Sequence, residues 1–233
     1  MNADRRLEPG TNDANESIVI NLPKLYPIVD FSSFVESPER MRHALPFAEQ
    51  LIAGGATIIQ FRDKSGDTLR MLSCARELRR ITDGRAKLII NDRFDICLAV
   101  QAEGVHLGQD DVTPEAARAV LDRVQTKEGE RRIVGFSTHT LAQVGEADSM
   151  PIDYLAVGPV FATGSKVNPD PVIGLEGVRQ ARAATAKPLV AIGGITRKNC
   201  REVMDAGADA VAVISDLLES PVKAVEEFLR VLG

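Results

Sequence analysis

The sequence predicts an α/β fold, a single (β/α)8 barrel of the TIM type with a short N-terminal extension. Three observations predict it. From about residue 25 onward, short apolar and β-branched runs alternate with longer stretches of helical period, the pattern of consecutive βαβ units in a parallel sheet. Eight such runs and eight such stretches can be counted, as a closed barrel of this kind requires. The length of 233 residues suits one domain of this architecture.

The elements follow one another in strict alternation. The predicted strands cover residues 25–30, 57–61, 87–91, 104–107, 132–136, 154–157, 188–192 and 210–214. The predicted helices begin near residues 38, 67, 94, 114, 140, 175, 196 and 221. The competing architecture is a doubly wound open sheet, which usually carries a glycine-rich fingerprint after its first strand. The segment LYPIVDFSS (25–33) contains no glycine, which favours the barrel.

Local signals support several helix boundaries. Ser37 before Pro38, and Thr113 before Pro114, each place an N-cap residue ahead of a proline at the first helical position. The segments AGGAT (53–57) and AGADA (206–210) place glycine where a helix stops just before a strand. These signals fix the alternation of helix and strand at both ends of the chain.

Composition excludes several classes of protein. Residues 1–22 are polar and without period, which predicts a disordered extension ahead of a catalytic barrel domain at 23–233. The net charge of −5 argues against nucleic acid as a partner. We expect no membrane partner and a cytoplasmic location, because the sequence shows neither a spanning apolar run nor a secretory h-region. The oligomeric state stays open, a homo-oligomer included.

Polar side chains gather just after the predicted strands, at the end where such barrels build their active sites. Alternation along TIIQFRDK (57–64) places Gln60, Arg62 and Lys64 on one side of the second strand. The other strand ends carry Asn91, Asp92 and Arg93; Gln109, Asp110 and Asp111; Ser137, Thr138 and His139; and Thr163, Ser165 and Lys166. So many polar strand ends are harder to explain as solvated loops than as one site.

One group of these residues suits a metal-bound polyphosphate. Asp92 and Asp111, with Asp110 as a substitute, supply the carboxylate oxygens that Mg²⁺ prefers. The cations are Arg62, Lys64, Lys166 and in addition Arg93, with Asn91 as an amide. Metal and cations together neutralise phosphate oxygens. The alternative reading is an ordinary salt-bridge network, for example between Arg62 and Asp92.

A second group suits a phosphate. Gly193 and Gly194 let the backbone approach an anion, and Thr196 is predicted to begin a helix whose free N–H groups face it. Ser215 lies at the neighbouring strand end, and phosphate sites after strands seven and eight recur in these barrels. Two anion sites imply two phosphorylated substrates or one bisphosphate. Since metal belongs to one of them, the pattern favours displacement of a magnesium-held diphosphate by a monophosphorylated molecule.

The remaining candidates are weaker. His106 lies within a strand and fits a hydrogen-bonded interior residue, whereas His139, at a strand end, fits either a proton carrier or a helix-cap group. His43 lies on a predicted helix surface. Cys74, Cys97 and Cys200 lie in helical patterns and are expected to be inert core residues.

The strand-end motifs together resemble those of the thiamine phosphate synthase family. The motifs, in family order, are QFRDK (60–64), IINDR (89–93), GVHLGQDD (104–111), GFSTH (135–139), DYLAVGPVFATGSK (153–166), AIGGI (191–195) and GADAVAVIS (207–215). The resemblance covers about residues 25–218. It implies a (β/α)8 barrel that joins hydroxymethylpyrimidine diphosphate to a thiazole phosphate, carboxylated or not, with Mg²⁺ and release of pyrophosphate. It implies that the diphosphate leaves first and that the thiazole nitrogen attacks a pyrimidine-stabilised carbocation.

The resemblance also implies site residues. For the pyrimidine diphosphate they are Gln60, Phe61, Arg62, Asp63, Lys64, Asn91, Ser137 and Lys166. Among these, Arg62, Lys64, Ser137 and Lys166 are the expected catalytic residues, and Asp92 and Asp111 are the expected magnesium ligands. For the thiazole phosphate they are Thr163, Gly164, Ser165, Gly194, Ile214 and Ser215. One departure is Thr163-Gly164-Ser165-Lys166, where the family usually has Thr-x-Thr-Lys.

Two other functions remain as alternatives. The related thiazole tautomerase shares much of this pattern but isomerises without a diphosphate, and His139 or a neighbour would then transfer the proton. A non-catalytic sensor of thiamine phosphate would have no use for a leaving-group clamp. The intact set of Gln60, Arg62, Lys64, Asp92 and Asp111 favours the synthase over both.

Overall fold

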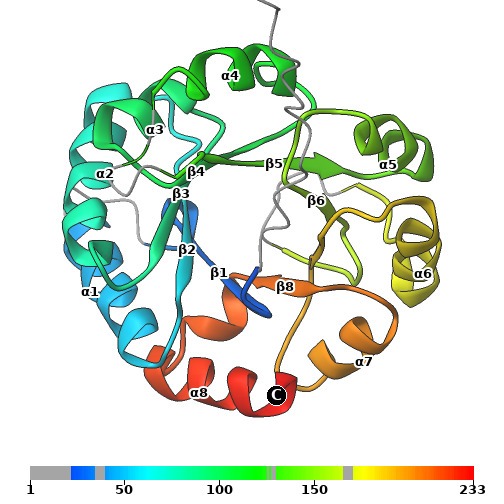
Figure 1. Cartoon of the computed structure of the whole chain (residues 1–233). Coiled ribbons are helices and arrows are strands. Elements are labelled where there is room, and N and C mark those ends of the chain that lie inside the picture. Colours follow the sequence, from blue (N-terminus) through cyan, green and yellow to red (C-terminus); the bar gives the residue numbers. More distant parts are fainter. Residues whose placement is uncertain (1–21, 35–39, 125, 127–129, 165–169) are drawn as a thin grey trace, which may run out of the picture.

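The computed structural model describes residues 22–34, 40–124, 126, 130–164 and 170–233. Within them, eight parallel strands close into a barrel in sequence order, from β1 through β8 and back to β1. Eight α-helices surround the strands as an outer ring (Figure 1). The predicted (β/α)8 barrel is confirmed. The predicted extension lies outside the described residues except for Leu22, which packs against the barrel interior.

The strands and helices have the following bounds. The strands are β1 Leu25–Asp30, β2 Ile58–Arg62, β3 Lys87–Asn91, β4 Gly104–Leu107, β5 Ile133–Thr138, β6 Tyr154–Val157, β7 Leu189–Ile192 and β8 Ala210–Val213. The helices are α1 Arg40–Ala53, α2 Thr68–Thr82, α3 Phe94–Val100, α4 Pro114–Leu121, α5 Leu141–Asp148, α6 Gly174–Ala184, α7 Cys200–Asp205 and α8 Pro221–Leu232. Two short 3₁₀ helices follow β1 and β8, η1 Phe31–Ser33 and η2 Ser215–Leu217.

Local chemistry explains most boundaries. The Thr113 side chain accepts a hydrogen bond from the N–H of Ala116 and begins α4, as predicted. Gly55 and Gly207 end helices at φ +105° and +110°, a region that glycine enters without strain. The prediction of a helix beginning at Thr196 is wrong, because α7 begins at Cys200. The predicted cap at Ser37 and Pro38 lies outside the described residues.

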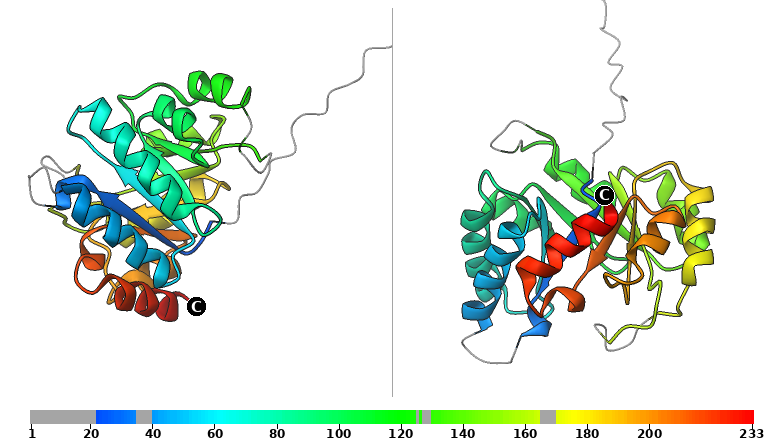
Figure 2. Two further views of the ribbon diagram at one scale, coloured as in Figure 1. Left: turned by 90° about the vertical axis from the view of Figure 1, so that its left-hand side faces the viewer. Right: turned by 90° about the horizontal axis from the view of Figure 1, so that it is seen from below.

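The core has two parts. A large apolar layer fills the space between the strands and the helix ring, and a smaller one fills the barrel interior. Figure 2 shows the helices packed around the strands from two further directions. The interior part contains Tyr26, Ile28, Ile58, Ile89, Ile133, Tyr154, Ala156, Val190, Ala210 and Ala212. These side chains plug the barrel, so a ligand can enter only at a mouth. None of the helices described here is both long and apolar enough to cross a membrane.

Candidate active site

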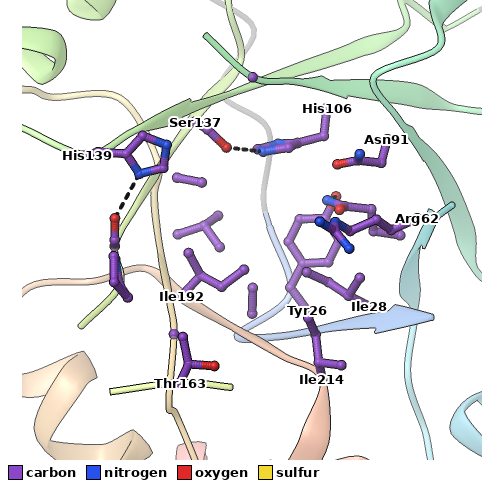
Figure 3. Close-up of a pocket in the computed structure, with 18 of the residues that line it drawn as sticks. Tyr26, Ile28, Arg62, Asn91, His106, Ser137, His139, Thr163, Ile192 and Ile214 are labelled. Atoms are coloured by element: carbon purple, nitrogen blue, oxygen red, sulfur yellow. Dashed lines mark hydrogen bonds between the residues drawn. The ribbon is translucent and has the colours of Figure 1, made fainter. Parts of the chain in front are cut away.

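A cavity of about 570 Å³ opens at the carboxyl ends of the strands. Its floor is apolar and is formed by interior side chains such as Ile28, Val190 and Ala212. Its wall carries the polar residues that follow the strands (Figure 3). They are Gln60, Arg62, Lys64, Asn91, Asp92, Gln109, Asp110, Asp111, Ser137, His139, Thr163 and Ser215. The polar strand ends that the sequence predicts to share one site thus border one cavity.

Strand β2 divides its residues between the cavity and the core. Gln60, Arg62 and Lys64 line the cavity, as alternation predicts. Phe61 faces the opposite way and packs edge-on against Phe31, with ring centroids 5.1 Å apart. Asp63 also lies outside the cavity wall, where it accepts a hydrogen bond from the N–H of Ser65. The side chains of Phe61 and Asp63, two of the residues that the resemblance implies for the pyrimidine diphosphate, therefore lie outside this cavity wall.

Two ion pairs organise the cations of the wall. Arg62 Nη1 lies 2.6 Å from Oδ2 of Asp30, the last residue of β1. Lys64 Nζ lies 2.6 Å from Oδ2 of Asp92. The alternative reading anticipated an ion pair between Arg62 and Asp92, but each of them has a different partner. Asp30 is a functional neighbour that the sequence reasoning missed, although it carries the same signal as the others, a charged residue at the end of an apolar strand.

Asp92 and Asp111 come together, as the magnesium prediction requires. Asp92 follows β3 in a left-handed conformation, φ +64°, which Asp tolerates better than most residues. Burial raises the pKa of Asp92 most, the neighbouring Lys64 opposes this, and the adjacent Asp111 carboxylate raises the pKa further. Asp111 is held by the N–H of Gly108, which donates to its Oδ2 at 2.7 Å. Asp110 is exposed at the cavity rim.

This acidic pair fits a magnesium ion better than a zinc ion. The donors are two carboxylates, and no group of three or more His, Cys, Asp and Glu side chains with metal-binding geometry occurs within the described ranges. Mg²⁺ is typically bound by one or two carboxylates and completes its shell with waters and substrate phosphates. Two partly buried carboxylates side by side also repel each other until a cation neutralises them.

A chain of hydrogen bonds runs along the floor of the cavity, through residues that line it. The hydroxyls of Tyr26 and Tyr154 lie 2.9 Å apart, and the Tyr154 hydroxyl lies 2.9 Å from Nδ1 of His106. His106 Nε2 lies 2.8 Å from Oγ of Ser137 (Figure 3). Burial lowers the pKa of His106 to about 4. His106 is therefore the hydrogen-bonded interior residue that the sequence predicts.

The two tyrosines of this hydrogen-bond chain also line the cavity, and the sequence reasoning missed them. Tyr26 and Tyr154 are the chain's two tyrosines, and both lie inside apolar strands, so composition gave them the appearance of core residues. The available signal was their hydroxyl groups, because a buried tyrosine hydroxyl requires a partner. Burial raises the pKa of both tyrosines, so both hydroxyls keep their protons.

His139 lies at the far side of the cavity. Its ring Nδ1 is 2.9 Å from the carbonyl oxygen of Gly158 and 3.4 Å from a carboxylate oxygen of Asp170. Its backbone N–H donates to the Gln143 side chain at 2.7 Å, while Thr140 is the N-cap of α5. Its ring is therefore not the helix-cap group that the sequence left open, and the ring borders the cavity.

The glycines after β7 form the remaining wall. Gly193 and Gly194 have φ of +101° and +64°. A Cβ at Gly193 would lie 2.5 Å from Cβ of Pro159, and one at Gly194 would lie 2.6 Å from the carbonyl oxygen of Ala162. The backbone after β7 thus approaches the segment after β6 too closely for any other residue.

The backbone N–H groups around Thr196, which the sequence predicts to face an anion, already have acceptors within the protein. The N–H of Thr196 donates to Oδ1 of Asn199 at 2.7 Å. The N–H of Arg197 donates to Oδ2 of Asp216 at 2.8 Å. The phosphate prediction therefore cannot depend on a helix N-terminus at this position. Gly194, Ile214, Ser215 and Thr163 do line this side of the cavity.

Three further predicted residues complete the set. Asn91, the last residue of β3, lines the cavity. Gly164 is exposed and is not part of the cavity wall. Ser165 and Lys166 lie outside the described residues. Cys74, Cys97 and Cys200 are buried away from the cavity, as expected of core residues, and burial raises the pKa of each thiol.

Comparison with known proteins gives a consistent result. A family model described as thiamine monophosphate synthase matches residues 25–217. The thiamine-phosphate synthase of Koribacter versatilis is 50% identical over 213 residues, covering 91% of this chain and 97% of that protein. The thiamine-phosphate synthase of Methanospirillum hungatei is 43% identical over 178 residues, covering 76% of this chain and 83% of that protein. The solved structure of thiamine phosphate pyrophosphorylase from Pyrococcus furiosus has a TM-score of 0.76 and 36% identity, covering 90% of this chain and 95% of that chain.

Proposed function

Because the chain belongs to the thiamine monophosphate synthase family and is a transferase of thiamine biosynthesis, we propose that its cavity joins hydroxymethylpyrimidine diphosphate to a thiazole phosphate. The products are thiamine phosphate and pyrophosphate. The observation that carries this proposal is the juxtaposition of the Asp92 and Asp111 carboxylates with Lys64 and Arg62 on one wall. A diphosphate leaving group needs this combination of metal ligands and cations.

The diphosphate binds on the side of β2 and β3. Arg62 and Lys64 donate to its oxygens, and Asn91 adds an amide from the neighbouring strand. The Arg62 guanidinium is already oriented before substrate binds, because its Nη1 lies 2.6 Å from Oδ2 of Asp30. A further positive charge is expected from Lys166. This residue follows β6 in the sequence and lies outside the described residues. The role of each cation is to neutralise negative charge as the leaving group departs.

Asp92 and Asp111 would hold the magnesium ion that this family generally uses. When bound, the ion supplies charge neutralisation for the diphosphate oxygens. Lys64 Nζ lies 2.6 Å from Oδ2 of Asp92, and with that carboxylate bound to the ion, Lys64 would be available to a substrate phosphate.

The thiazole phosphate binds on the opposite side, along β6, β7 and β8. Thr163 and Ser215 offer hydroxyl donors, and Gly194 and Ile214 complete this part of the wall. Gly164 and Ser165 remain candidates from the sequence, although Gly164 lies outside the cavity wall. The apolar floor between the two sides, including Ile28 and Ile192, would exclude water from a reactive carbocation.

The protein's contribution is then positioning and charge stabilisation. The buried cysteines lie away from the cavity, so a covalent thiol intermediate has no support. Departure of pyrophosphate leaves a cation on the pyrimidine methylene, and the thiazole nitrogen forms the new C–N bond with its lone pair. Holding both partners in one cavity supplies much of the rate enhancement for such a step.

The test is direct. Purified protein, Mg²⁺ and both phosphorylated precursors should give thiamine phosphate and pyrophosphate in equal amounts. The same mixture without Mg²⁺, or without the thiazole phosphate, serves as the control. Isomerisation of a thiazole carboxylate phosphate in place of condensation would indicate the tautomerase. Tight binding of thiamine phosphate without any turnover would indicate the sensor.

A further inference from the structure

The hydrogen-bond chain along the floor of the cavity connects two residues proposed to bind the pyrimidine substrate. Gln60 Nε2 donates to the Tyr26 hydroxyl at 3.4 Å, and the chain continues through Tyr154 and His106 to Ser137. Gln60 and Ser137 line the cavity on different strands, β2 and β5. The three residues between them are almost fully buried, with exposed fractions of 1% for Tyr26, 0% for Tyr154 and 7% for His106.

A glycine on β5 allows this chain of hydrogen bonds to form. His106 on β4 and Tyr154 on β6 are separated by β5, so their side chains would not normally touch. In the register of the sheet, His106 pairs with Gly135, and Gly135 pairs with Tyr154. A Cβ at Gly135 would collide with the Tyr154 ring. Because Gly135 has no side chain, the Tyr154 ring stacks with the His106 ring at a centroid distance of 5.5 Å.

One order of donors and acceptors gives every buried hydroxyl and ring N–H along the chain a partner. Tyr26 accepts from the Gln60 amide nitrogen, so its own proton goes to Tyr154. Tyr154 then gives its proton to Nδ1 of His106, which must be unprotonated. A neutral imidazole carries its one proton on the other nitrogen, so Nε2–H donates to Ser137 Oγ.

We propose that Tyr154 is a positioning residue for this reaction, holding His106 as the Nε2–H tautomer so that Ser137 must donate its hydroxyl proton into the cavity. With its oxygen occupied as an acceptor, Ser137 recognises an acceptor atom of the bound substrate, such as a ring nitrogen of an aminopyrimidine. Gln60, at the other end of the chain, keeps its carbonyl oxygen for a donor such as the ring's amino group. This inference rests on the proposed function for the identity of the substrate.

The tautomer of His106 can be determined in the protein without substrate. In full-length protein labelled with ¹⁵N-histidine, long-range ¹H–¹⁵N spectra distinguish protonated from unprotonated ring nitrogens, and the His106→Gln variant assigns the signal. We expect His106 to be the Nε2–H tautomer in the wild-type protein. In the Tyr154→Phe variant, which removes only the hydroxyl, Nδ1 loses the donor that fixes it as an acceptor, so we expect exchange between the two tautomers in place of a single Nε2–H form. An Nδ1–H form in the wild-type protein would overturn the proposal, whatever the variant does.

Kinetics test whether Tyr154 acts through Ser137. Tyr154→Phe should lower kcat/KM for the pyrimidine diphosphate about tenfold and leave KM for the thiazole phosphate unchanged. Ser137→Ala should lower it at least as much. In the double variant the loss should stay within about twofold of Ser137→Ala alone, because the two residues serve one interaction. Losses that multiply would show that Tyr154 does not act through Ser137.

A matched variant separates this role from packing. Tyr26→Phe removes the neighbouring buried hydroxyl but leaves Tyr154 able to donate to His106, so its effect on the His106 tautomer should be the smaller of the two. An equal or larger effect would contradict the assigned order. Failure of the wild-type enzyme to form thiamine phosphate would refute the proposed function, whereas the wrong tautomer refutes the role of Tyr154 alone.

Discussion

Lys64 Nζ lies 2.6 Å from Oδ2 of Asp92, so a cation from β2 neutralises the carboxylate that follows β3. Both side chains line the cavity, together with Asp111 and Arg62. In this arrangement Lys64 stabilises the ionised form of Asp92, whereas the neighbouring Asp111 carboxylate disfavours that form by repulsion. A divalent ion held by Asp92 and Asp111 would neutralise these carboxylates in its place, and Lys64 would then be available to the substrate diphosphate.

Removing the Asp92 carboxylate should therefore abolish most turnover. We expect Asp92→Ala to lower kcat at saturating substrates by two or more orders of magnitude, about 3 kcal/mol, as with other losses of preorganised charge stabilisation. The measurement is pyrophosphate release in saturating Mg²⁺. Asp95→Ala is the matched control, because Asp95 is a nearby acid whose exposed side chain pairs with Arg93 outside the cavity. Near-normal turnover of the Asp92 variant would refute the metal assignment.

The ion pair between Asp30 and Arg62 should support stability as well as activity. Asp30 is 1% exposed and also accepts hydrogen bonds from the N–H and hydroxyl of Ser32. In Asp30→Asn, Arg62 loses its charged partner, and breaking a buried pair in this way costs about 3 kcal/mol. Denaturant unfolding would measure this loss, and kcat/KM for the pyrimidine diphosphate should fall with it.

The exposed pair between Glu77 and Arg80 provides the comparison. Its side chains are 39% and 76% exposed, and surface pairs of this kind contribute about 0.5 kcal/mol or less. Glu77→Gln should therefore leave the free energy of unfolding nearly unchanged. If the Asp30 and Glu77 variants lose equal stability, the pair at the cavity wall is not an organising contact.

The sequence predicts the fold and the rim of the cavity well, because both depend on local patterns. Apolar strands alternating with helices determine the barrel, and the residues that follow each strand must reach the same mouth. Gln60, Arg62 and Lys64 follow from the alternation of one strand, and the structure places all three in the cavity.

What the sequence does not predict depends on contacts between distant segments. The contact of His106 with Tyr154 crosses β5 and exists only because Gly135 lies between them. The N–H of Arg197 already donates to Asp216, a residue of η2, which follows the next strand, β8. No local pattern carries information of this kind.

Burial of His106 should make stability depend on pH. Its pKa is about 4 in the folded chain and 6.5 in its ordinary state. Between these values the unfolded chain binds a proton that the folded chain does not, so stability is full above pH 6.5 and falls as pH is lowered toward 4. The shift corresponds to about 3 kcal/mol. Unfolding free energies from pH 4 to 7 would measure it.

Other groups titrate in the same range, so the difference between two proteins is the useful quantity. His106→Gln has no titrating ring, and we expect its stability to fall less over this interval than that of the wild-type chain. Parallel stability curves for the two proteins would show that His106 is not the residue responsible.

Gly135 tests the link between the barrel's packing and its chemistry. In Gly135→Ala the new methyl group would overlap the Tyr154 ring, so the ring must shift away from its place between Tyr26 and His106. Overpacking of this kind costs about 1–3 kcal/mol, and the shift should also lower kcat/KM for the pyrimidine diphosphate.

Gly145→Ala is the matched control, because Gly145 lies in the exposed part of α5 with open space around its Cβ position. That variant should gain up to about 1 kcal/mol from helix propensity and keep full activity. An active, stable Gly135 variant would mean that the barrel tolerates Tyr154 elsewhere, and that the contact with His106 is not required for catalysis.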